Sequence, residues 1–263
     1  RLFRGETMYP THIPDLNEAL GGDRSKGGLA AGEVTIIGGF TNVGKSLLSQ
    51  SLFAHYLTLG IPTVYFNIEV RQDLFISQLF SQITGEWLYQ NKSSQFLNPA
   101  WDHYEAFLRS KEDRFVLYNQ DGPRSVTSLE SEIEKYASDG YEVFFLDTIN
   151  SLMGHGERKD LFIEVMITLE SLAKRYNIAI IATAQMKQSL MFGDDKRPNL
   201  WDIGEGVAIQ QKAGTVIGIY RSDKYGESTA QGIMGQCDYT SLMMLTLRNR
   251  SAEHGEFVRV SYD

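Results

Sequence analysis

The sequence predicts an α/β fold with a mostly parallel central sheet, flanking helices and a C-terminal antiparallel hairpin. Three observations predict it. Short β-branched runs alternate with longer stretches of helical periodicity. Several of these runs are apolar throughout, as expected for strands that are buried on both faces. The last two runs, 242–247 and 257–261, follow one another without an intervening helical stretch.

The elements are expected in regular alternation along the chain. The strands are expected at residues 33–38, 63–68, 114–118, 142–147, 177–184, 215–220, 242–247 and 257–261. The helices are expected at residues 47–57, about 71–83, about 100–110, 125–137 and 160–176, with 86–99 irregular. Ser125 is the expected N-cap of the fourth helix, with Ser128 as the alternative.

Length and composition fit a globular protein of one large domain or two small ones, because 263 residues with 42% apolar content can form a sizeable core. No linker, repeat or low-complexity segment divides the chain. We therefore expect a residual linker at 1–12 and a single domain at 13–263. The chain opens on Arg1 rather than Met, so we expect a fragment of a longer protein.

Cysteine content and net charge indicate the cellular compartment and the kinds of partner to expect. One cysteine, Cys237, excludes an intramolecular disulfide and suits a reducing compartment. There is no apolar run long enough to span a bilayer and no secretory segment, so we expect a cytoplasmic protein with no membrane partner. A net charge of −8 disfavours a protein that coats nucleic acid through its whole surface. It leaves open a protein that grips nucleic acid with a few loops lining a channel.

The segment Gly39-Phe-Thr-Asn-Val-Gly44-Lys45-Ser46 fits G-x-x-x-x-G-K-[ST], the P-loop that cradles a nucleoside triphosphate. It lies between an expected strand and an expected helix, so backbone N–H groups and the helix N-terminus can point at phosphate oxygens. Lys45 would reach the β- and γ-phosphates, and Ser46 would bind Mg²⁺. A glycine turn beside a lysine is the ordinary alternative. The residues expected to contact the nucleotide are Gly39, Thr41, Asn42, Val43, Gly44, Lys45, Ser46 and Leu47.

Three polar residues lie at or just after the ends of expected strands, at the sheet edge where open α/β sheets bind ligands. Asp147 is expected to hold Mg²⁺ together with Ser46, and Glu69 is expected to act as general base on the attacking water. Gln185 can hydrogen-bond the γ-phosphate and report its loss. The ordinary alternatives are an aspartate that caps a turn, a surface glutamate that opens a helix, and a polar strand end.

Basic residues supply the remaining candidates. Arg248 and Arg250 lie two apart on one strand and face the same side, so we expect them to project into a neighbouring subunit's ATP site. A solvated edge strand is the alternative. The polar loop from 186 to 200 is a candidate binding site for a polymer, although it could be ordinary protein surface. The expected DNA-binding residues are Lys187, Lys196 and Arg197, with Arg158 and Lys159 as a weaker second group.

Five features occur together in one order: the P-loop, Asn67-Ile-Glu69-Val, Phe144-Phe-Leu-Asp147, Ala184-Gln185-Met and Arg248-Asn-Arg250. In this the chain resembles the C-terminal ATPase domain of hexameric replicative DNA helicases, the DnaB-like group with its phage and Twinkle-type relatives. The resemblance covers about residues 13–260.

The resemblance implies a RecA-like fold, ATP and Mg²⁺ as cofactors, and a homo-hexamer around single-stranded DNA that translocates 5′ to 3′ and unwinds duplex at the replication fork. Glu69 would be the catalytic base, Gln185 the sensor, Arg250 the arginine finger and Arg248 its companion. Primase and a helicase loader would be partners. The setting would be a bacterial or phage-infected cytoplasm rather than a mitochondrial matrix.

The chain departs from the family's pattern in three places. Gly204 stands where the family usually has Arg, which puts the usual polar linkage beside the DNA loop in doubt. The segment 251–255 after Arg250 is longer than is typical. The N-terminal collar or primase domain and the helix that docks on the next subunit are expected to be absent from this fragment, so we expect it to be monomeric or weakly associated.

Two other functions stay open. A RecA/RadA- or KaiC-like ATPase would assemble on DNA or protein without unwinding, and the segment 13–22 is compatible with it. A regulatory nucleotide-binding module would lack turnover. Glu69 and the Arg-x-Arg strand favour an ATP-hydrolysing DNA helicase over both.

Overall fold

A computed structural model describes residues 7–86, 99–119, 121–152, 158–186, 197–203, 206–221, 241–249 and 257–261. The strands are β1 (Met8–Tyr9), β2 (Leu29–Ala30), β3 (Val34–Gly39), β4 (Thr63–Asn67), β5 (Phe115–Asn119), β6 (Val143–Asp147), β7 (Ala179–Gln185), β8 (Thr215–Tyr220), β9 (Ser241–Asn249) and β10 (Phe257–Ser261). The helices are α1 (Pro14–Ala19), α2 (Lys45–Leu59), α3 (Gln72–Thr84), α4 (Pro99–Arg109), α5 (Val126–Ser138), α6 (Ile149–Leu152), α7 (Arg158–Tyr176) and α8 (Gly206–Lys212).

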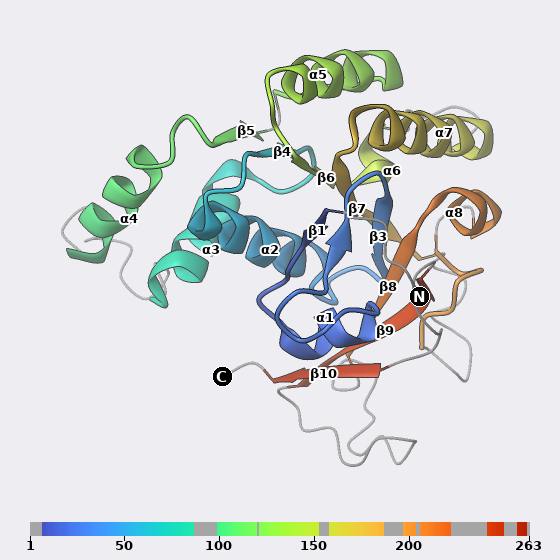
Figure 1. Cartoon of the computed structure of the whole chain (residues 1–263), viewed down its shortest axis with the longest axis horizontal. Helices are drawn as coiled ribbons and strands as arrows, with labels where there is room; N and C mark the ends of the chain where they lie inside the picture. Colours follow the sequence, from blue (N-terminus) through green and yellow to red (C-terminus); the bar gives the residue numbers. More distant parts are fainter. Residues whose placement is uncertain are drawn as a thin grey trace.

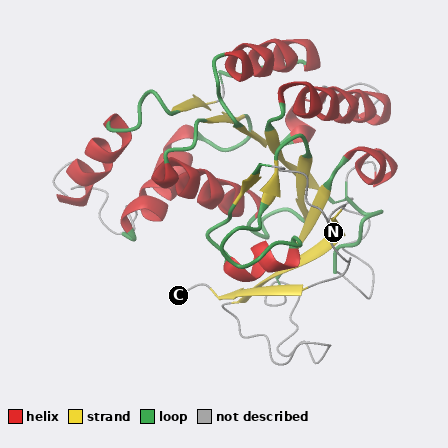
Figure 2. Cartoon of the chain, viewed as in Figure 1, coloured by secondary structure: helices red, strands yellow, loops and turns green. Residues whose placement is uncertain are grey.

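The main sheet has eight strands in the order β10-β9-β8-β3-β7-β6-β4-β5. From β8 to β5 all neighbours are parallel, whereas β9 pairs antiparallel with β8 and with β10. Helices α2 and α3 lie on one side of this sheet, and α5 and α7 lie together on the other (Figures 1 and 2). The predicted α/β fold, with its parallel sheet and C-terminal antiparallel pair, is confirmed.

The core explains why the sheet strands read as continuous apolar runs. Every residue of β3, β4, β6 and β8 is buried, so neither face of these strands meets solvent. Aromatic side chains join α2 to the sheet: the ring of Phe53 lies edge-on to Tyr65 at 5.1 Å and to Phe145 at 5.9 Å. This packing fixes α2, and therefore the loop that precedes it, against the strands.

The N-terminal segment closes one side of the domain. Asn17 of α1 accepts a hydrogen bond from the backbone N–H of Thr11 at 2.8 Å and donates one to the Thr11 carbonyl at 3.1 Å. Tyr9 of β1 is buried and packs edge-on against Tyr56 of α2 at 6.2 Å. The domain boundary expected at Ile13 stays a prediction, although β1 in the preceding stretch pairs with β2.

Elements that the sequence analysis did not predict are short. They are β1, β2, α1, α6 and α8, which have two to seven residues each. A helix of four residues such as α6 spans barely one turn and shows no hydrophobic period. In the described part of the chain, no helix combines the length and apolarity needed to cross a membrane.

Candidate nucleotide-binding and hydrolysis site

Four neighbouring strands, β4, β6, β7 and β3, end at the same edge of the sheet. Their registers align the expected site residues. Gly39, where the P-loop begins, lies opposite Gln185, and Asn67 lies opposite Asp147. Glu69 follows β4 by two residues. The parallel sheet therefore brings together residues that are more than a hundred positions apart in the chain.

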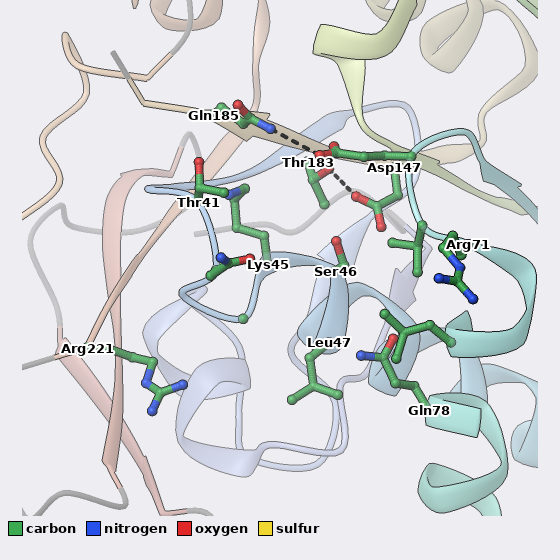
Figure 3. Close-up of a pocket in the computed structure, with 15 residues that line it drawn as sticks. Thr41, Lys45, Ser46, Leu47, Arg71, Gln78, Asp147, Thr183, Gln185 and Arg221 are labelled. Atoms are coloured by element: carbon green, nitrogen blue, oxygen red, sulfur yellow. Dashed lines mark hydrogen bonds between the residues drawn. The ribbon is translucent and has the colours of Figure 1, made fainter. Parts of the chain in front are cut away.

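These strand ends open into a cleft of about 660 Å³ (Figure 3). Most of the residues predicted to bind nucleotide or Mg²⁺ line it, and so do Glu69 and Gln185. The full lining is Thr41, Asn42, Gly44, Lys45, Ser46, Leu47, Glu69, Val70, Arg71, Leu74, Gln78, Asp147, Thr183, Gln185 and Arg221.

The P-loop has the backbone of an anion cradle. Asn42 and Gly44 adopt positive φ angles of 61° and 108°, which turn successive N–H groups toward one side of the loop. A side chain at Gly39 would force its neighbours to shift, because a Cβ there would lie 2.9 Å from Cγ2 of Val43 and 3.0 Å from the carbonyl oxygen of Ile219. Val43 is buried in the core cluster and supports the loop from below. A nucleotide contact for Gly39 or Val43 stays a prediction.

The ammonium group of Lys45 lies over the loop. Its Nζ donates a hydrogen bond to the carbonyl oxygen of Phe40 at 2.7 Å, and the side chain is buried at the start of α2. The ammonium is thus held beside the concavity where a phosphate would bind. A phosphate oxygen would compete with the Phe40 carbonyl for this donor.

Asp147 is buried at the floor of the cleft, with 1% of its surface exposed. Its carboxylate accepts hydrogen bonds from Thr183 Oγ1 at 2.6 Å and from Tyr65 OH at 3.4 Å. Burial raises the pKa of Asp147, while hydrogen bonds from Thr183 and Ser46 and the charge of Lys45 act to lower it. These donors offset part of the cost of holding a charged carboxylate inside the protein.

The same carboxylate fits a Mg²⁺ site. Ser46 hydrogen-bonds to Asp147, so a hydroxyl and a carboxylate oxygen lie together beside the phosphate cradle. Both are oxygen ligands of the kind Mg²⁺ prefers, and Mg²⁺ usually takes only one or two protein ligands, together with water and substrate phosphates. Among the described residues no cluster of three or more His, Cys, Asp or Glu forms a separate metal centre.

Glu69 and Gln185 face each other across the mouth of the cleft. Gln185 Nε2 donates to Glu69 Oε1 at 3.4 Å (Figure 3). Partial burial and the nearby charge of Asp147 raise the pKa of Glu69, whereas Lys45 and Gln185 act to lower it. A carboxylate whose pKa is raised toward neutrality is a better proton acceptor than an ordinary surface glutamate.

Asn150 of α6 holds the backbone at the end of β7. Its Oδ1 accepts a hydrogen bond from the N–H of Gln185 at 3.0 Å. Thr148 donates to the same Oδ1 at 3.3 Å and to the carbonyl oxygen of Thr183 at 2.8 Å. These bonds tie the chain just after Asp147 to the end of β7.

The structure describes only some of the basic residues that were expected to bind DNA or a neighbouring ATP site. Arg197 is exposed, and Arg248 lies in β9 opposite Val216, beside an irregularity in the β8–β9 register. Arg158 and Lys159 form the first turn of α7. The side chains of Arg158, Lys159 and Arg248 lie outside the described residues, and so do Lys187, Lys196, Gly204 and Arg250.

The sequence analysis missed several residues that line the cleft or contact its side chains. The alternation of strand side chains could have indicated Thr183, because it lies two residues before Gln185 on β7 and so faces the same side. Tyr65 reaches Asp147 from the neighbouring strand, which depends on strand order. Three further residues that no sequence motif marked line the cleft: Arg71 directly before α3, Gln78 of α3 and Arg221 directly after β8.

Comparison with known protein families identifies the family of this chain. The model of the DnaB-like helicase C terminal domain matches residues 10–262, nearly the whole chain. This chain belongs to that DnaB-like family. The resemblance inferred from the P-loop, Glu69, Asp147, Gln185 and the Arg-x-Arg strand is thereby confirmed.

Relatives of this DnaB-like domain are distant. It is 25% identical over 209 residues to the replicative DNA helicase DnaB of Helicobacter pylori (strain ATCC 700392 / 26695), covering 77% of this chain and 43% of the relative. It is 23% identical over 231 residues to the replicative DNA helicase DnaB of Geobacillus stearothermophilus, covering 85% and 49%. The chain therefore spans less than half the length of either relative.

Solved structures share the fold of the DnaB-like domain. One, described as an ATPase domain, aligns with a TM-score of 0.75 at 17% identity, covering 95% of this chain and 86% of that one. A DnaB-like replicative helicase, solved in a study of its interactions with primase, aligns with a TM-score of 0.75 at 15% identity, covering 90% and 58%.

Proposed function

We propose that this DnaB-like domain hydrolyses ATP with Mg²⁺ and uses the cycle to move 5′ to 3′ along single-stranded DNA and to unwind duplex at a replication fork. The observation that carries the proposal is the cleft itself, which gathers Lys45, Ser46, Glu69, Asp147 and Gln185 at one sheet edge. Phosphoryl transfer requires phosphate binding, a metal carboxylate and a group that orients water, and these five residues cover those needs.

Each residue has a defined part in hydrolysis. The P-loop N–H groups and Lys45 bind the phosphates, and Ser46 and Asp147 would hold Mg²⁺, which neutralises charge on the phosphate oxygens when bound. Glu69 accepts the proton of the attacking water, for which its raised pKa suits it. Gln185, whose amide contacts Glu69, donates instead to the γ-phosphate when ATP is present.

Full turnover is proposed to require a second copy. Arg250, with Arg248 as its companion, would enter the cleft of the next subunit and stabilise the transition state, an effect worth roughly 10³–10⁵ in rate for arginine fingers. The full-length protein would form a homo-hexamer around the DNA. The chain alone would bind ATP but hydrolyse it slowly, as a monomer or a weakly associated species.

The proposed DNA contacts are electrostatic. Arg197, which is exposed, and the neighbouring Lys187 and Lys196 would contact the phosphate backbone, with Arg158 and Lys159 as a second group. Primase and a helicase loader are proposed as further partners of the full-length protein, in a bacterial or phage-infected cytoplasm.

Fork unwinding by the full-length protein tests the proposal. Forks that carry only a 5′ tail or only a 3′ tail should be distinguished, because a 5′-to-3′ motor loads on the 5′ tail. The Lys45→Ala variant is the control and should unwind neither fork. ATP hydrolysis without unwinding of either fork would favour a RecA/RadA- or KaiC-like ATPase. ATP binding without turnover would favour a regulatory module.

A further inference from the structure

Among the described residues, Trp201 is the exposed tryptophan. It is 57% exposed, and it is the sole aromatic among the exposed large apolar side chains of the described residues. Trp101, by contrast, is half-buried and stacks on Phe80 with 5.8 Å between ring centroids. Aromatic residues, Trp among them, are enriched at surfaces that contact another molecule.

The turn that carries Trp201 is anchored on both sides. Asn199 accepts hydrogen bonds from the N–H of Trp201 through Oδ1 at 2.9 Å and from the N–H of Asp202 through its carbonyl at 3.1 Å. Ile203 is fully buried, and its side chain fills the space over Gly38, where a Cβ would lie 2.3 Å from Ile203 Cδ1. These contacts hold the backbone of the turn in place beside the core.

The same turn is joined to the nucleotide site. Ile203 forms an antiparallel bridge with Met186, the residue directly after Gln185. The N–H of Met186 also donates to the carbonyl of Gly39, where the P-loop begins, at 3.1 Å. Because Met186 contacts both segments, a shift of the Gln185 backbone would also displace the turn that holds Trp201.

We propose that Trp201 is a stacking platform for a base of single-stranded nucleic acid. Indole faces stack on any base, so such a contact suits a protein that must hold DNA without reading its sequence. Arg197 is exposed four residues earlier on the same segment, so the segment carries a basic side chain as well as the indole. Combined aromatic and basic side chains are the usual composition of single-strand binding surfaces.

A second copy of this chain is the competing occupant. Protein interfaces bury contiguous apolar patches around their aromatic anchors. The described neighbours of Trp201 in the sequence do not extend such a patch, since Asn199 and Asp202 are polar and Leu200 packs against the core. A single exposed ring whose described sequence neighbours are polar or packed on the core fits one base better than it fits a protein surface.

The inference rests on the proposed function, and its test separates stacking from charge. Affinity for a labelled oligo(dT) and for an abasic deoxyribose-phosphate strand of equal length is measured by anisotropy on the full-length protein. Trp201→Ala should weaken oligo(dT) binding by about tenfold or more and leave abasic-strand binding unchanged. Trp201→Phe should keep most of the affinity, and the control Trp101→Phe should behave as wild type.

The slope of log affinity against log salt supplies a second readout. It should be unchanged in Trp201→Ala, because no phosphate contact is lost. Equal weakening on both strands would overturn the stacking role. Unchanged DNA affinity in Trp201→Ala would overturn it as well, and altered sedimentation of that variant would assign the ring to a second copy. Wild-type protein that hydrolyses ATP but binds neither strand would contradict DNA translocation itself, which separates failure of the proposed function from failure of the role of Trp201.

Discussion

The side-chain amide of Gln185 and the carboxylate of Glu69 lie within hydrogen-bond reach, with 3.4 Å between Nε2 and Oε1. Glu69 follows β4 and Gln185 ends β7, and β6 with its terminal Asp147 lies between them in the sheet. The proposed sensor and the proposed base are therefore in contact across the strand that ends in Asp147, the proposed metal ligand. A γ-phosphate that takes the Gln185 amide would release Glu69 to act on water.

The contact with Gln185 should be visible in the pH dependence of activity. Glu69 must be ionised to act as base, so kcat/KM should fall as the pH drops through its pKa, which lies above the usual 4.5. Because the Gln185 hydrogen bond lowers this pKa, Gln185→Ala should move the acid limb to higher pH. Steady-state rates across the pH range measure the shift. The exposed Gln82 of α3 gives the control Gln82→Ala, and an acid limb that stays in place would contradict the contact.

Thr183→Val should impair use of Mg²⁺ because it removes the donor that lies 2.6 Å from Asp147 while keeping the side-chain shape. Partners of metal ligands typically account for about 10–100-fold in metal affinity, so the half-saturating Mg²⁺ concentration should rise by that factor. The free energy of unfolding should fall by about 1–3 kcal/mol. Thr35→Val, at a buried threonine near the start of β3, is the control. An unchanged Mg²⁺ titration would remove Thr183 from the site.

Asn150 should position Gln185 without touching nucleotide. Asn150→Leu removes the acceptor for the Gln185 N–H, and kcat should fall by roughly tenfold because small displacements near reacting groups are costly. The Kd of a fluorescent ATP analogue should stay within a few-fold. Asn150→Asp keeps an acceptor oxygen and should restore part of kcat. Equal losses of kcat and of nucleotide affinity in both variants would point to a general structural defect instead.

Arg250 is predicted to act on the neighbouring subunit. In the full-length protein, Arg250→Ala should reduce turnover by about 10³–10⁵ while leaving ATP binding nearly intact. Mixing it with inactive Glu69→Gln subunits should restore part of the activity, since some interfaces then combine an intact Glu69 with an intact Arg250. No recovery on mixing, with mixed rings verified by mass, would contradict action in trans.

The sequence allowed the parallel sheet and the ends of its strands to be predicted because buried parallel strands are continuous apolar runs. A polar residue that ends such a run, such as Asp147 or Gln185, is conspicuous and falls at the ligand-binding edge. Contacts that depend on strand order could not be predicted in the same way. Tyr65 meets Asp147 only because β4 pairs with β6.

Local features were harder to predict for a different reason. Asn150 lies on a helix of four residues, too short for a hydrophobic period, and its bond to Gln185 spans 35 positions. Trp201 could equally have been a core residue by composition, and its exposure follows from the anchoring of Asn199 and Ile203 on either side. The roles of Arg248 and Arg250 stay predictions, since both side chains lie outside the described residues.

The central claim is that the cleft hydrolyses ATP in response to single-stranded DNA, and the ATP turnover of the full-length protein tests it most directly. Rates are measured with and without a single-stranded oligonucleotide, for wild type and for Glu69→Gln, with nucleotide binding measured in parallel. The account predicts DNA-stimulated turnover in the wild type, and in Glu69→Gln a loss of about 10²–10⁴ with ATP binding retained. Turnover by Glu69→Gln at the wild-type rate, or a wild-type rate that DNA leaves unchanged, would contradict it.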